Sequence, residues 1–152
     1  LIKFTNWEQY DLPSNAESAK IIILGEDENG IVESFRFLAS QTKMKIDGRI
    51  LEIIHFKNKL NNEAKLKLSQ KPQIVFFLPE SNFVVNDIKE LSPKSLMIGN
   101  GREFVVEFDG DISFTSSKNR IRLVINKKTF SRKSPKLSSS ISTLRNVVEI
   151  VR

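Results

Sequence analysis

The sequence contains no cysteine, and that absence alone excludes several kinds of site. A chain without cysteine has no disulfide framework, no thiolate zinc site and no cysteine nucleophile. Histidine is nearly absent too, since His55 is the only one, and it does not cluster with acidic residues as a metal site would require. No Gly-x-Ser-x-Gly motif is present to supply a serine nucleophile. We therefore expect a protein that is not an enzyme, with no catalytic residues, no metal and no cofactor.

Long apolar runs are also missing. The longest, Ile21 to Leu24 and Ile74 to Leu78, are far shorter than the roughly 20 residues that a membrane-spanning helix needs. The chain begins at Leu1 without a basic stretch leading into an apolar segment, so export cannot be read from it directly. We expect no membrane insertion, and we expect that any signal peptide has been removed.

What the sequence does contain is enough for one compact domain over residues 1–152, because 39% of its 152 residues are apolar. The formal net charge is +6, and the basic excess lies in the last two thirds of the chain. Such a distribution permits an acidic partner, an anionic membrane surface or nucleic acid. A solvated basic surface with no special partner is the plainest interpretation.

Strand and helix patterns alternate along the first two thirds of the chain. Lys20 to Leu24, closed by Gly25, has the continuous apolar character of a strand buried on both faces. Further strands are predicted at residues 49–56, 73–78 and 95–98. Apolar residues at helical spacing follow the first three of these strands, and Ser81 is the expected N-cap of the third helix.

The last third departs from this alternation. Residues 112–114 and 121–125 flank a polar turn at 117–119, which predicts an antiparallel hairpin. A C-terminal helix is then predicted from five apolar residues at helical spacing: Leu137, Ile141, Leu144, Val148 and Val151. The fold class that follows is α/β, a three-layer sandwich around a mostly parallel sheet, with an antiparallel edge hairpin and a C-terminal helix.

Ligands of open α/β sheets bind beyond the carboxyl ends of the strands, which directs attention to three loops, at 25–30, 79–81 and 99–101. The first loop is acidic and suits an amine or a cation better than a phosphate, so we reject dinucleotide binding there. A phosphorylated receiver domain is disfavoured because Leu78-Pro79-Glu80 stands where its aspartate is needed. A solvated turn is the plainer interpretation of the first loop. The ligand-binding hypothesis assigns seven residues to one crevice: Gly25, Glu26, Asp27, Asn29, Gly30, Ser81 and Asn100.

The basic stretch from Lys127 to Lys136 contains Phe130 and offers an alternative from another class, a polyanion or nucleic-acid binding module. A single aromatic residue offers little surface on which nucleic-acid bases could stack. We therefore do not expect a nucleic-acid partner. A module that binds a small ligand, a polyanion or nucleic acid stays the alternative function.

Several blocks of the sequence, in order, resemble the YfiR-like family of exported bacterial proteins. In the N-terminal half they are Phe4-Thr5-Asn6-Trp7, Ile21 to Asp27, Gly48-Arg49 with the strand after it, and Ile74 to Ser81. The sharpest matches lie in the C-terminal half: Asp109 to Phe114, Arg120 to Asn126, and Leu137 to Ile141. No single block is a catalytic signature, so the specificity lies in their order and spacing.

The resemblance implies a periplasmic α/β domain, often a homodimer, that regulates by binding another protein. The best-studied kind represses a membrane diguanylate cyclase by binding its periplasmic part, which controls cyclic di-GMP and biofilm formation; other members have other partners, so a sensor kinase is also open. That repressor relies on disulfides, and the absence of cysteine here puts redox control in doubt. No motif places the family's interface residues on this chain.

Overall fold

The computed structural model describes residues 5–6, 18–41, 45–46, 48–117, 120–133, 136–137 and 147–151. The chain divides into two compact units. Leu12–Ser95 form the first, called here the N-terminal unit, and Leu96–Arg152 together with Leu1–Asp11 form the second, the C-terminal unit. The expectation of one domain over residues 1–152 stays a prediction.

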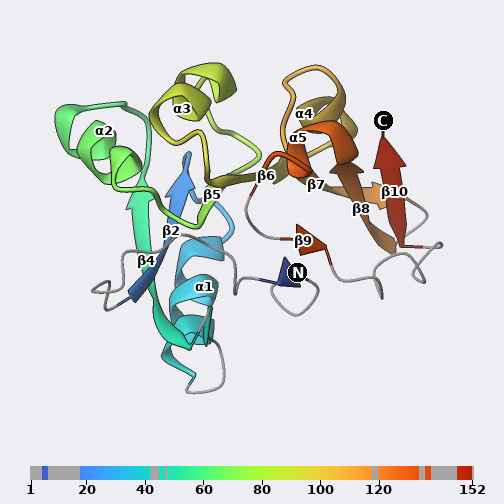
Figure 1. The fold of residues 1–152 in the computed structure, drawn as a ribbon. Coiled ribbons are helices and arrows are strands. Elements are labelled where there is room, and N and C mark those ends of the chain that lie inside the picture. Colours follow the sequence, from blue (N-terminus) through green and yellow to red (C-terminus); the bar gives the residue numbers. More distant parts are fainter. Residues whose placement is uncertain are drawn as a thin grey trace. The chain divides into compact units, whose positions relative to one another are not determined.

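In the described part of the N-terminal unit, strands and helices largely alternate (Figure 1). In chain order they are β2 (Ser18–Leu24), α1 (Ile31–Ser40), β3 (Lys45–Ile46), β4 (Arg49–Phe56), α2 (Asn62–Ser69), β5 (Ile74–Phe77) and α3 (Val85–Leu91). The strands lie in the order β5-β2-β4-β3. β2 is parallel to both β4 and β5, and the short β3 is antiparallel to β4.

β2 lies in the middle of this sheet because its side chains are apolar on both faces. Residues 21–24, three isoleucines and a leucine, have no exposed surface. The chain steps from β2 to β4 in one direction and from β4 to β5 in the other, so right-handed crossovers put α1 and α2 on opposite faces. Phe35 of α1 packs on Phe76 of β5 with ring centroids 5.5 Å apart, and α2 contacts α3. The N-terminal unit therefore has three layers.

The C-terminal unit contains a second set of strands in the order β10-β8-β7-β6. Its elements are β6 (Leu96–Asn100), α4 (Arg102–Val106), β7 (Ile112–Ser117), β8 (Arg120–Asn126), α5 (Lys127–Phe130) and β10 (Val148–Val151), with β1 (Thr5–Asn6) and β9 (Lys136–Leu137) as a separate antiparallel pair. β7 and β8 form the predicted antiparallel hairpin, while β6 is parallel to β7 and β10 is parallel to β8. The mostly parallel α/β fold is thereby confirmed.

The predicted C-terminal helix is wrong wherever the structure describes that stretch. Leu137 lies in β9, and Val148 and Val151 lie in β10, while Ile141 and Leu144 lie outside the described residues. Residues 147–151 read Val-Val-Glu-Ile-Val, and such β-branched side chains favour a strand. Apolar residues four and three apart are compatible with either pattern over so short a stretch, which explains the error.

The predicted N-cap of α3 is also wrong. α3 begins at Val85, and its N-cap Val84 forms no side-chain hydrogen bond with the helix. Ser81 lies earlier, in a turn where its N–H donates to the Leu78 carbonyl oxygen over 3.0 Å. Its hydroxyl accepts a long hydrogen bond of 3.4 Å from the Phe83 N–H.

Candidate functional site

The loop after β2 meets the loop after β5, as parallel strands require. Gly25 has φ of +121°, a backbone conformation that side chains rarely adopt. A Cβ atom at Gly25 would also lie 3.0 Å from the Ser81 Cα and 3.1 Å from the Leu78 Cβ. Glycine is therefore needed at this position for both conformation and space. Two of the seven predicted ligand residues, Gly25 and Ser81, are thus in contact.

Asp27 uses its carboxylate inside the protein. One carboxylate oxygen accepts a 2.8 Å hydrogen bond from the Ile31 N–H, and the other accepts a 2.9 Å bond from the Val32 N–H. These are free N–H groups of the first turn of α1, whose N-cap Gly30 has no side chain to bind them. Asp27 therefore caps α1 from three residues upstream of Gly30.

The electrostatics of Asp27 agree with this role. Burial by itself raises the pKa of the Asp27 carboxyl, but the N–H groups of Val32 and Ile31, the charge of His55 and the Asn29 N–H together bring the pKa below its usual value. The carboxylate also occupies the positive end of the α1 dipole. The N-terminus of α1 thus holds an anion that belongs to the chain, which agrees with the rejection of phosphate binding at this loop.

His55, near the end of β4, supports the same loop from the next strand. Its Nε2 lies 2.7 Å from the Gly25 carbonyl oxygen, and because a carbonyl only accepts, Nε2 is the donor. The ring is half-buried. This contact fixes the turn after β2, so His55 has a structural role here.

The remaining predicted ligand residues are less tightly held. Glu26 is half-buried, and one of its carboxylate oxygens accepts a 3.4 Å hydrogen bond from the Asn58 side chain. Asn29 and Gly30 are exposed, with Gly30 in the left-handed conformation at φ of +69°. Asn100 is the last residue of β6 and belongs to the C-terminal unit. Ligand binding by this set stays a prediction.

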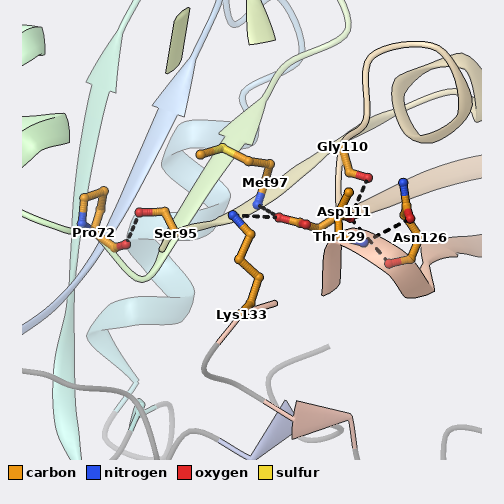
Figure 2. Close-up of polar contacts among 8 residues, drawn as sticks. All are labelled: Pro72, Ser95, Met97, Gly110, Asp111, Asn126, Thr129 and Lys133. Atoms are coloured by element: carbon orange, nitrogen blue, oxygen red, sulfur yellow. Dashed lines mark hydrogen bonds and ion pairs between the residues drawn. The ribbon is translucent and has the colours of Figure 1, made fainter. Parts of the chain in front are cut away.

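A buried ion pair in the C-terminal unit, drawn in Figure 2, was not foreseen. The Lys133 Nζ lies 3.6 Å from the Asp111 Oδ2, and the two side chains are only 7% and 1% exposed. The same oxygen accepts a 2.8 Å hydrogen bond from the Met97 N–H. Asp111 thus joins β6, the start of β7 and the chain after α5.

The backbone of Asp111 continues this connection. Its N–H donates to the Met97 carbonyl oxygen over 3.1 Å, and its carbonyl oxygen accepts from the Asn126 N–H over 2.9 Å. The Asn126 side chain caps α5 by accepting from the Thr129 N–H at 3.2 Å (Figure 2). Two of the sequence blocks that resemble the YfiR-like family, 109–114 and 120–126, therefore meet here.

Sequence reasoning missed this ion pair because it treated Asp109-Gly110-Asp111 as an ordinary turn. Only Asp109 has the turn conformation, with φ of +54°, whereas Asp111 has no exposed surface. Its partner Lys133 is 22 positions away (133 minus 111) in a stretch interpreted as a basic surface. The one signal available was that Asp111 directly precedes an apolar strand, so its side chain was placed to enter the core.

α4 packs on this region through the ring of Phe104. A Cβ atom at Gly99 would lie 2.4 Å from that ring, and one at Gly110 would lie 2.1 Å from it. Gly99 and Gly110 are thus needed for close packing, so the glycines of loop 99–101 serve the fold at least in part.

The geometry therefore defines an α/β fold whose characteristic acidic and imidazole groups hold loops and helices in place. Asp27 caps α1, His55 fixes the Gly25 turn, and Asp111 pairs with Lys133. In the part of the chain that the structure describes, no group of three or more His, Asp or Glu residues is arranged to hold a metal ion. No helix among these residues combines the length and apolar character needed to span a bilayer.

The comparison with known families agrees with this class. The chain matches the YfiR/HmsC-like family over residues 1–144, and it belongs to that family. A search of the curated proteins gives no match.

Proposed function

We propose that the chain is a non-enzymatic periplasmic regulator that binds the periplasmic part of a membrane signalling protein and represses it. A membrane diguanylate cyclase is the partner that we favour, with control of cyclic di-GMP as the result. The observation that carries this proposal is membership of the YfiR/HmsC-like family over residues 1–144. The structural roles of Asp27, His55 and Asp111 support it, because the groups most suited to acid–base chemistry already have partners within the fold.

The experiment that tests the proposal is a pull-down from detergent-solubilised membranes of the native organism, with the chain as bait. Bound proteins are identified by mass spectrometry, and each candidate is then purified and its affinity measured by calorimetry. Saturable binding of a membrane cyclase, or of a sensor kinase, supports a regulator. Capture of neither, across repeated salt and detergent conditions, contradicts it.

A small ligand that tunes this complex is part of the proposal, and the loop after β2 is its place. Asp27 is bound to α1, so Glu26 and Glu28 are the carboxylates of this loop that remain for a ligand, and an amine or a cation is the ligand class that they suit. Calorimetry with a panel of amines tests this idea. The informative variant is Glu26→Gln rather than Asp27→Ala, since the latter also damages α1. If the heat of amine binding is the same for Glu26→Gln as for the wild type, the ligand is removed from the proposal.

A further inference from the structure

Part of the β7–β8 hairpin extends beyond the neighbouring strands. β6 pairs with residues 112–114 of β7, and β10 pairs with residues 123–126 of β8. Residues 115–117 and 120–122 pair with each other, and no other described strand pairs with them. We call these six residues the hairpin arm. Both of its outer edges lack a described neighbouring strand.

The two faces of the hairpin arm carry different chemistry. Thr115 lies opposite Arg122 in the antiparallel register, and Ser116 lies opposite Ile121. Side chains directly opposite one another share a face of the ladder, so one face is polar and cationic and the other presents Ile121. Ile121 is 70% exposed, the largest value among the large apolar residues that the structure describes. Ile121 therefore leaves an apolar side chain on the hairpin arm that burial against another surface would stabilise.

The charge of the hairpin arm has one sign. Arg120 and Arg122 are both exposed, and within the described residues neither guanidinium forms an ion pair or a hydrogen bond. Arg102 in the same unit differs, because it lies 3.1 Å from the Glu149 carboxylate. Residues 115–122 also include Lys118 and contain no acidic residue. Electrostatic complementarity therefore requires an acidic surface on whatever binds here.

We infer that the hairpin arm is the surface that docks on the partner, and that the partner presents an acidic patch around a small apolar depression that receives Ile121. This inference rests on the proposed function and deepens it. A protein fits better than an anionic membrane for two reasons. One exposed apolar side chain offers little surface for insertion among lipids. The two outer edges of the hairpin arm offer backbone groups that a partner loop or strand can pair with.

The test uses the full chain and the purified periplasmic domains of the native organism's membrane diguanylate cyclases, with affinity measured by calorimetry. We expect Arg120→Glu with Arg122→Glu to weaken binding by roughly tenfold or more, because close charge pairs across an interface become repulsive. We expect Ile121→Ser to weaken it by about tenfold as the loss of a buried apolar anchor. Affinity should also fall as salt is raised, and less so in the double variant.

The matched control is Lys127→Glu with Lys128→Glu, which makes the same change of charge at two exposed lysines of α5, outside the hairpin arm. It should bind like the wild type if the position of the charge matters. Binding is compared only among variants whose thermal stability equals that of the wild type.

The possible outcomes separate the docking surface from the proposed function. If a cyclase domain binds the wild type and the arm variants equally well, the hairpin arm is not the docking surface, although the proposed function stands. If no domain binds the wild type, the proposed function and the inferred docking surface both fail. Binding to phosphatidylglycerol vesicles with the same dependence on Arg120, Arg122 and Ile121 overturns the choice of a protein partner.

Discussion

Asp27 was expected to face a ligand, and instead it serves the helix that follows it. The sequence shows an acidic loop after a buried strand, but not which carboxylate turns back toward the chain. That choice depends on Gly30, whose left-handed backbone and missing side chain leave the first N–H groups of α1 without a local cap. α2 illustrates the usual arrangement, because its N-cap Asn61 itself accepts from the Ala64 N–H over 2.8 Å. The role of Asp27 could therefore be recognised only from the geometry of the loop.

Replacing Asp27 by alanine removes both hydrogen bonds to α1 and should lower the free energy of unfolding by about 1 kcal/mol, the usual value of a helix cap. Urea denaturation of Asp27→Ala and of the control Glu28→Ala, an exposed neighbour, checks this. Equal midpoints for the two variants would show that Asp27 does not stabilise α1.

The stabilisation that Asp27 provides also depends on pH. Because the pKa of Asp27 is lowered by folding, its stabilising effect is complete above its ordinary value of 3.8 and is lost as the pH falls through the folded pKa. The stability difference between wild type and Asp27→Asn should therefore shrink between pH 5 and pH 2. A difference that stays constant over this range would contradict the assignment.

Two buried serines differ in whether their hydroxyls are satisfied. Ser113 and Ser95 both have no exposed surface, but the Ser113 Oγ has no hydrogen-bond partner among the described residues, whereas the Ser95 Oγ donates to the Pro72 carbonyl oxygen (Figure 2). Ser113→Ala should therefore be neutral or stabilising by up to about 1 kcal/mol, and Ser95→Ala should be destabilising by about 1–3 kcal/mol. Thermal melts of the two variants give the comparison. The reverse order would refute it.

At the scale of elements, the sequence predicted best the strands of the N-terminal unit that are rich in β-branched and other apolar residues. β4 has the bounds that were predicted, residues 49–56, and β2 and β5 differ from prediction by two residues or fewer at each end. A continuous run of β-branched residues between turn residues fits few structures other than a strand. β10 was missed because apolar residues four and three apart also fit a helix, and its pairing with β8 is not visible in the sequence.

The Asp111–Lys133 pair connects three elements and offers a prediction at this scale. Lys133→Met leaves the Asp111 carboxylate buried without its cation, which should cost roughly 3–5 kcal/mol of unfolding free energy. Adding Asp111→Asn removes the uncompensated charge, so the double variant should be less destabilised than the sum of the two single variants. Lys128→Met, at an exposed position of α5, is the control. Urea denaturation that shows Lys133→Met to be as stable as Lys128→Met would contradict a structural role for the pair.

At the scale of the whole molecule, the sequence blocks that resemble the family led to the correct family and fold, although most of those blocks do not carry chemistry. Asp109 to Phe114 and Arg120 to Asn126 meet in a buried polar cluster that holds the C-terminal unit together. The partner surface that we infer lies at the arm of the same hairpin, where Arg120, Ile121 and Arg122 are exposed and no packing constraint could have indicated them. Function in this chain is thus expected on exposed residues, with the buried polar residues serving the fold.

The function that we propose for this chain is repression of a membrane enzyme through binding to its periplasmic part. The most direct measurement is the rate of cyclic di-GMP synthesis by the full-length membrane cyclase in proteoliposomes, with its periplasmic domain facing outward and GTP enclosed within the vesicle. Addition of the purified chain outside should lower the rate in a saturable way, and the Arg120→Glu, Arg122→Glu double variant should need a concentration roughly tenfold higher. A rate that stays unchanged at saturating wild-type chain, for each of the organism's membrane cyclases, would contradict the claim.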